Sequence, residues 1–177
     1  MIYFIIGGCV LLFLILLLVI TILNYKLSFA LIKISKAEED IDIYLIKKKD
    51  LLDRTRPIVI KELKLESFLT DLDQDFSVIN NFLENDILRR NYNDFLKTVD
   101  ENDKLLKSSA LKSIISDLEE NEEYIIGAIK FYNDTVVDYN KLVMSFPGAI
   151  IAFFKRYKKK EFYNDEKRDM YEILNDR

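Results

Sequence analysis

The sequence of 177 residues contains no histidine and no tryptophan, and it has one cysteine, two prolines and four glycines. Without histidine, and with Cys9 inside an apolar run, the chain lacks the ligands of a zinc site and the usual nucleophile–base pairs. One cysteine also excludes a disulfide within the chain. Catalysis would have to use carboxylates, lysine or tyrosine. We expect no enzyme activity and no cofactor, because the heptad seams described below favour a scaffold.

Charge is absent from one stretch, the 22 residues Ile2 to Leu23. As a helix this stretch is about 33 Å long, which is enough to cross a hydrocarbon core of about 30 Å. A cleaved secretory signal would begin with basic residues and end at a small-residue cleavage site, and this stretch has neither feature. We therefore predict a retained membrane anchor over residues 1–25, in contact with the lipid bilayer.

The charges beside the anchor predict its orientation. No Lys or Arg precedes it, whereas Lys26, Lys33 and Lys36 follow it closely. Basic residues near the ends of a span are retained on the cytoplasmic side. We predict a single-pass protein of the cell membrane with its N-terminus outside and its C-terminal domain in the cytoplasm.

The rest of the chain is highly charged, with 26 basic and 30 acidic residues in total. A mildly acidic domain has no general nucleic-acid signature, so we expect no nucleic-acid partner. The scarcity of Gly and Pro leaves few turn signals for β-structure. We predict an all-α fold in which the transmembrane helix is followed by an antiparallel bundle of about four long helices over residues 26–147, with a basic and aromatic C-terminal segment and tail over 148–177.

Apolar residues at heptad spacing predict the helices of this bundle. The clearest seam contains Ile125, Ile129, Tyr132, Val136, Tyr139, Val143 and Phe146, and Pro147 with Gly148 ends it. The first soluble helix continues from the anchor to Pro57, with a seam through Ile34, Ala37, Ile41, Tyr44, Lys48 and Leu51. A second helix is predicted over 58–88, with Leu63, Phe68, Leu72, Phe76, Ile79 and Leu83 in its core.

The region 85–110 gives the weakest signal. Two polar clusters, 85–86 and 91–94, are typical of turns, and a renewed apolar stripe follows at Leu111, Ile114, Ile115 and Leu118. We predict a short third helix here, and the sequence leaves open whether it is fused to the fourth.

Two blocks of sequence resemble the LemA family. The first resembles I-D-x-x-L-x-[KR]-[KR]-x-D-L-[IL], on Ile41, Asp42, Leu45, Lys47, Lys48, Asp50 and Leu51. The second resembles E-x-x-I-x-x-A-R-x-x-Y-N-x-x-V-x-x-Y-N…F-P, on Glu122, Ile125, Ala128, Tyr132, Asn133, Val136, Tyr139, Asn140, Phe146 and Pro147. Two residues depart from the family pattern: Ile129 stands where the family usually has Arg, and Asp53 stands where it usually has Pro. The resemblance implies a divergent or shortened member, that is, a bacterial single-span protein with a cytoplasmic helix bundle and no assigned reaction.

A Tyr-Asn pair occurs twice in the second block, seven residues apart. Both tyrosines of Tyr132-Asn133 and Tyr139-Asn140 therefore face the same way. A buried tyrosine needs a partner for its hydroxyl. We favour interhelical packing with hydrogen bonds, and a ligand pocket is the alternative.

Several charged groups are predicted to be solvated. Among Lys47, Lys48 and Lys49, Lys48 occupies the seam and is expected to extend its ammonium into water, although an acidic partner is an alternative. Asp71, Asp73 and Asp75 begin like a calcium loop, but Phe76 and Phe82 occupy the positions that need Gly and Glu, so we predict no metal site. The acidic cluster Asp117, Glu119, Glu120, Glu122 and Glu123 is expected to lie on a solvated helix face.

The last feature is a group of aromatic and basic residues after Pro147. It comprises Phe153, Phe154, Lys155, Arg156, Lys158, Lys159 and Lys160. Such a combination suits an anionic leaflet, so we predict a lipid-binding segment over 148–160. Alternatively, residues 149–154 cap the bundle, and the two uses are compatible.

We therefore expect a non-enzymatic interaction or membrane-organising scaffold, with protein partners that the sequence does not identify. The alternatives are a regulatory partner of a membrane protease or signalling complex, or an enzyme that uses carboxylates or tyrosine. An enzyme would need a concave site with convergent polar groups.

Overall fold

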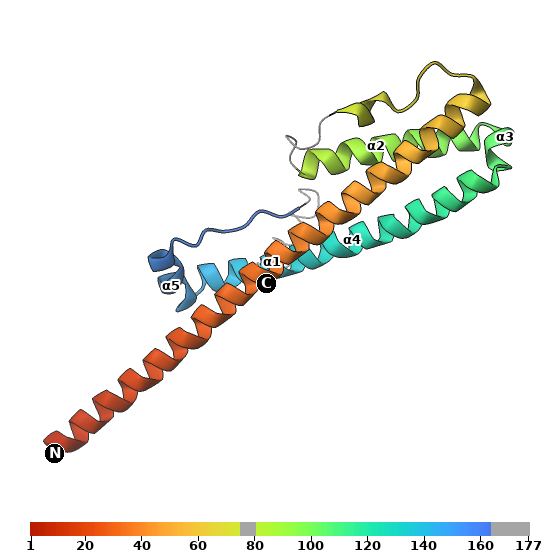
Figure 1. Cartoon of the computed structure of the whole chain (residues 1–177). Coiled ribbons are helices and arrows are strands. Elements are labelled where there is room, and N and C mark those ends of the chain that lie inside the picture. The colour runs from red at the N-terminus through yellow and green to blue at the C-terminus, as the bar shows by residue number, and fades with distance from the viewer. Residues whose placement is uncertain (75–80, 164–177) are drawn as a thin grey trace. The chain divides into compact units, whose positions relative to one another are not determined.

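The computed structural model of the chain describes residues 1–74 and 81–163, and the side chains of 81–83 lie outside this description. Every element in the described ranges is helical (Figure 1). The elements are α1 (Ile2–Leu63), the 3-10 helix η1 (Thr70–Asp73), α2 (Asn81–Asp100), α3 (Asp103–Leu106), α4 (Ser109–Met144) and α5 (Gly148–Lys155). The all-α prediction is confirmed.

Helix α1 is continuous over 62 residues, from the apolar N-terminal stretch into the charged part of the chain. Its N-terminal part is the one helical segment in the described ranges that is long and apolar enough to cross a membrane. The predicted end at Pro57 is wrong, because this proline lies inside the helix. Pro57 is exposed, while Thr55 and Val59 on either side of it are fully buried. Burial of the neighbouring residues favours continuation over the local break that proline promotes.

The second helix predicted over 58–88 is also wrong in its bounds. The chain leaves α1 at Lys64, which adopts a left-handed conformation with φ 53°, and α2 begins only at Asn81. Between them, Arg56 of α1 holds the returning chain. Its Nε donates to the Phe68 carbonyl (3.1 Å), and its two Nη atoms contact the Asp73 carboxylate (2.6 and 2.9 Å). Of the residues predicted for this core, Leu72 is buried, whereas Phe76 and Ile79, like Asp75, lie outside the described residues.

Helix α2 contains both polar clusters that were predicted as turns. Asn91 is buried there, and its Nδ2 donates to the Ile87 carbonyl at 2.8 Å. An asparagine that bonds back to its own helix does not break it. The short α3 follows as a separate helix, and α4 begins at Ser109.

Helix α4 carries the predicted seam. The seam residues Ile125, Ile129, Tyr132, Val136 and Tyr139 are buried, and Val143 is half-buried. The assignment of Phe146 to the seam is wrong. The helix ends at Met144, the Phe146–Pro147 peptide bond is cis, and the Phe146 side chain is 83% exposed.

The chain divides into two compact units. Residues 38–130 form one unit, whose core is built from the α1, η1, α2, α3 and α4 side chains Ile41, Leu45, Leu52, Leu72, Leu88, Phe95, Leu105, Leu111 and Leu118. Residues 1–37 and 131–177 form the other unit. Within its described part, Leu27, Ile34, Tyr132, Val136, Tyr139, Ile151 and Ala152 are buried.

The turn from α4 into α5 depends on Gly148. A Cβ atom placed on this residue would lie 2.1 Å from the Leu142 carbonyl oxygen. We expect Gly148→Ala to destabilise the protein by about 2 kcal/mol, because the contact is with backbone that has to shift. Gly127→Ala is the matched control, since nothing lies within 4 Å of its Cβ position. Alanine at this helical site should instead stabilise by up to about 1 kcal/mol.

Thermal unfolding of the full chain in detergent measures both substitutions. Equal melting temperatures for the two variants would contradict the packing described for the α4–α5 turn.

Candidate functional site

Four side chains of α4 hold the segment that follows α5. We call Tyr132, Asn133, Tyr139 and Asn140 the Tyr–Asn ladder, and residues 157–163 the strap. The Tyr139 hydroxyl donates to the Lys158 carbonyl (3.0 Å), and the Tyr132 hydroxyl donates to the Glu161 carbonyl (2.9 Å). These bonds hold the strap as an extended chain alongside α4 (Figure 1).

The two asparagines complete the ladder. Asn140 forms a two-way clamp, because its Nδ2 donates to the Lys160 carbonyl and its Oδ1 accepts from the Lys160 N–H, both at 2.9 Å. The Oδ1 of Asn133 accepts from the Tyr163 N–H at 2.8 Å. The Tyr163 ring is buried and lies edge-on to the Tyr132 ring, with centroids 6.1 Å apart.

The heptad spacing of the Tyr-Asn pairs correctly placed them on one face. The prediction that their hydrogen bonds join helices is wrong, because the bonds described above end on main-chain atoms of the strap. Burial raises the pKa of the Tyr139 hydroxyl, and the neighbouring Tyr157 adds to this rise. Tyr139 is therefore a neutral hydrogen-bond donor at physiological pH.

Helix α5 has two different faces. Gly148, Ile151 and Ala152 are buried, whereas Phe153 and Phe154 are 80% and 79% exposed. The two exposed rings contact each other edge-to-face, with centroids 5.7 Å apart. One face of α5 thus packs as the capping alternative requires, and the other carries the aromatic residues of the predicted lipid-binding segment.

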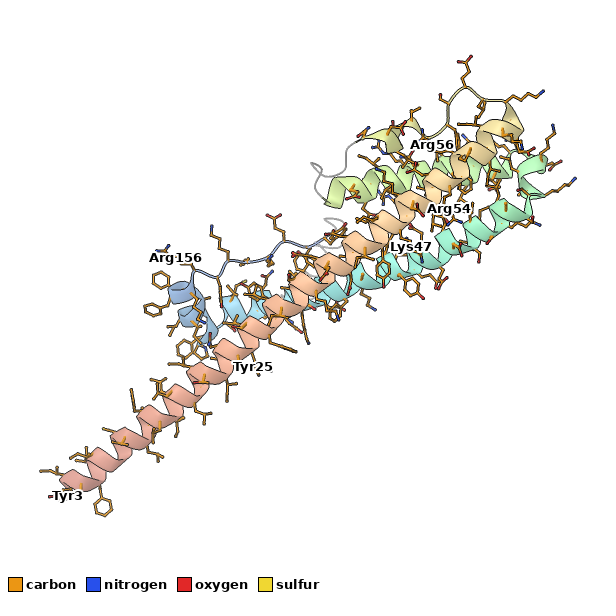
Figure 2. The ribbon with its side chains drawn as sticks, viewed as in Figure 1. Tyr3, Tyr25, Lys47, Arg54, Arg56 and Arg156 are labelled. Carbon is orange, nitrogen blue, oxygen red and sulfur yellow. The ribbon has the colours of Figure 1, made fainter. Side chains whose placement is uncertain are left out.

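The basic residues of this segment follow the exposed rings directly in the sequence. Lys155, Arg156, Lys158 and Lys159 are exposed, and Lys160 is half-buried. Arg156 ends α5 in a left-handed conformation with φ 57°, and the Tyr157 N–H closes the helix by donating to the Ala152 carbonyl at 2.9 Å. Figure 2 labels Arg156 at this turn, from which the strap departs. A left-handed residue other than glycine costs about 1 kcal/mol.

Sequence reasoning missed part of this apolar surface. Met144 at the end of α4 and Phe146 in the turn that follows it are also exposed. Phe146 was assigned to the seam because it continues the heptad spacing. The signal that could have corrected the assignment is Pro147, which disfavours helical conformation in the residue before it.

A second polar feature lies in the unit formed by residues 38–130. The Lys48 side chain is 1% exposed, and its ammonium forms an ion pair with the Glu122 carboxylate. It also lies 5.3 Å from the centroid of the Tyr92 ring. The prediction that Lys48 reaches water is wrong, and Glu122 does not share the solvated position expected for its acidic cluster.

The ion pair is held beside a buried amide. Asn121 is fully buried, and its Nδ2 donates to the Tyr44 carbonyl at 3.0 Å. Burial lowers the pKa of Lys48, whereas the hydrogen bond and charge of Glu122 act in the opposite direction. Burial also raises the pKa of the Tyr92 hydroxyl, with further contributions from Glu119 and Glu122.

The surface of the described ranges includes two depressions, one of which is lined by residues 62–64 and 101–104. The other depression, beside Arg56, is lined by Lys49, Asp53, Arg56, Pro57, Ile60, Leu72 and Asp73. Arg56 is already engaged there by Asp53 and Asp73, which tie η1 to α1. Within residues 1–74 and 81–163, no three His, Cys, Asp or Glu side chains are grouped to hold a metal ion.

Comparison with known proteins gives one match. The LemA family profile matches residues 37–173, which includes the ladder, the strap and both motif blocks. No curated protein and no solved structure matches the chain. Because the profile covers more than half of its length, the chain belongs to the LemA family.

Proposed function

We propose that this protein is a single-pass membrane scaffold whose aromatic and basic segment makes a second contact with anionic lipid. The observation that carries the proposal is the exposure of Phe153 and Phe154 beside exposed cations. Exposed aromatic rings insert at the membrane interface, and each nearby cation contributes about 1 kcal/mol at an anionic surface. In water alone, this apolar exposure would favour aggregation.

The fold restricts the segment in a way that supports this role. The strap is bound through its main chain, so Lys158 and Lys159 keep their side chains in solvent. Helix α5 is anchored by its buried face, so its aromatic face stays exposed. Together these features present rings and cations on one short stretch without disturbing the core.

A non-enzymatic role is supported by the engagement of the polar groups. The ladder is occupied by the strap, Lys48 is paired with Glu122, and Arg56 is paired with Asp53 and Asp73. The matched LemA family profile names no reaction. We infer that the protein acts by holding partners or membrane rather than by transforming a substrate.

The orientation is part of the proposal. Suppose that Lys26, Lys33 and Lys36 retain the domain in the cytoplasm. A reporter that works only in the cytoplasm should then be active when fused after Arg177, and a reporter that works only outside the membrane should be inactive there. Added protease should then leave the domain intact in whole cells and digest it in opened cells. Digestion of the domain in intact cells would reverse the assigned orientation.

The lipid contact can be tested with the full chain in vesicles. An environment-sensitive fluorophore is attached at Ile150→Cys in a Cys9→Ser background. We expect its emission to shift to the blue in vesicles that contain anionic lipid, and to return toward the aqueous value at high salt. Replacing Lys155, Arg156, Lys158, Lys159 and Lys160 by Gln should abolish the shift.

The matched control replaces three exposed cations elsewhere, Lys104, Lys107 and Lys112, by Gln. This variant should keep the full emission shift. If the five-Gln variant gives the same emission as the unsubstituted segment in anionic vesicles, the segment does not bind lipid through its charge.

A further inference from the structure

The Tyr–Asn ladder recognises an extended chain independently of its sequence. Its five hydrogen bonds end on the carbonyls of Lys158, Lys160 and Glu161 and on the N–H groups of Lys160 and Tyr163. Asparagine that pairs with both main-chain groups of one residue reads backbone and not side chain. Any extended segment that offers these groups in the same order can make the same bonds.

All four residues of the ladder lie within the single helix α4. Asn133 is fully buried and Tyr139 is 1% exposed, and both project from the long helix α4. One ring adds selectivity, because Tyr163 of the strap packs edge-on against Tyr132. The preferred occupant is therefore an extended segment with an aromatic residue at the position of Tyr163.

We propose that the ladder is a binding site for an extended peptide, filled by the strap of its own chain and open to the strap of a second copy. In such an exchange, the hydrogen bonds that hold the strap to the ladder within one chain would instead form between two copies. It extends the proposed scaffold role and does not depend on the lipid contact.

Two observations favour a second copy as the occupant. The strap is the segment already known to satisfy the register and the aromatic position of the ladder. Arg156, which connects the strap to α5, is a non-glycine residue at φ 57°, so a change at this connection relieves strain. Copies held in one membrane also meet at a high effective concentration, which favours exchange.

The test uses two full-length variants with complementary defects. Lys160→Pro removes the N–H that donates to Asn140 and leaves the ladder intact. The double variant Asn133→Ala, Asn140→Ala removes the asparagines of the ladder and leaves the strap intact. The two chains carry different affinity tags, are produced together, and are purified through one tag in neutral detergent without anionic lipid.

We expect the mixed pair to recover the partner chain about tenfold more efficiently than either same-variant pair, because only the mixed pair combines an intact ladder with an intact strap. Matched controls are Lys159→Pro, whose N–H makes none of the five ladder bonds, and Asn93→Ala on the exposed face of α2. A pair built from these two control variants should recover the partner chain as efficiently as a pair of unsubstituted chains.

Equal recovery from the mixed and same-variant pairs, with helical circular dichroism retained, would overturn the proposal. If Lys160→Pro does not fold, Tyr163→Ala replaces it as the strap variant, because it removes the aromatic contact and keeps the backbone groups. Since no anionic lipid is present, failure of this test leaves the lipid-contact proposal to be judged by its own experiment.

Discussion

Tyr139→Asp is expected to lower the free energy of unfolding by about 4 kcal/mol, the largest effect of any substitution considered for this chain. Tyr139 is 1% exposed, and its hydroxyl donates to the Lys158 carbonyl. Aspartate would place an ionised carboxylate in the same space, facing a carbonyl oxygen that cannot donate to it. For a chain of this size the melting temperature should fall by roughly 10 °C.

Two further variants separate burial from hydrogen bonding at this site. Tyr139→Phe keeps the ring and loses only the hydroxyl, so the expected cost is about 1 kcal/mol. Phe131→Asp introduces the same carboxylate on the exposed side of α4, where we expect less than about 1 kcal/mol. Thermal unfolding in detergent gives all three values, and a Tyr139→Asp protein as stable as Phe131→Asp would show that Tyr139 is not a core residue.

Glu122→Gln is expected to destabilise the protein by about 3 kcal/mol, because it leaves the buried ammonium of Lys48 without its counter-charge. The neighbouring Glu123 is exposed, so Glu123→Gln is the matched control and should change stability by less than about 0.5 kcal/mol. Equal effects of the two substitutions would mean that the ion pair contributes nothing to the folded state.

The same variant has a predicted pH dependence. Burial already holds the pKa of Lys48 below its ordinary value in the folded chain, and Glu122 opposes this shift. Without Glu122, the pKa of Lys48 in the folded chain falls further. The pH range in which the unfolded chain binds more protons than the folded chain is therefore wider. Stability then rises with pH in that range. The deficit of Glu122→Gln relative to the unsubstituted protein should therefore shrink as pH approaches roughly 10, the ordinary lysine value.

The sequence predicted the features that depend on local periodicity. The apolar stretch, the first seam and the α4 seam from Ile125 to Tyr139 all follow from spacing along one helix, and the structure places them as expected. Pro147 correctly marked the end of α4. Pro57 did not mark an end, because burial of Val59 depends on packing that no local rule contains.

Pairing across the chain could not be predicted from spacing. Lys48 and Glu122 are 74 residues apart, and only the packing of α1 against α4 within one unit brings them together. The partners of the Tyr–Asn ladder belong to a segment without helical periodicity, which gave no signal of its own conformation. Composition identified the aromatic and basic segment, but not which face of α5 is buried.

The backbone-directed ladder has a consequence for how this protein tolerates mutation. Because the bonds at positions 158, 160 and 161 end on main-chain atoms, the side chains there can vary without loss of the bonds that hold the strap. Proline at 160 is an exception, because the Lys160 N–H donates to Asn140. The surface charge of this segment is thus free to drift independently of the fold, and under the proposed lipid contact single substitutions would adjust it to membranes of different lipid composition.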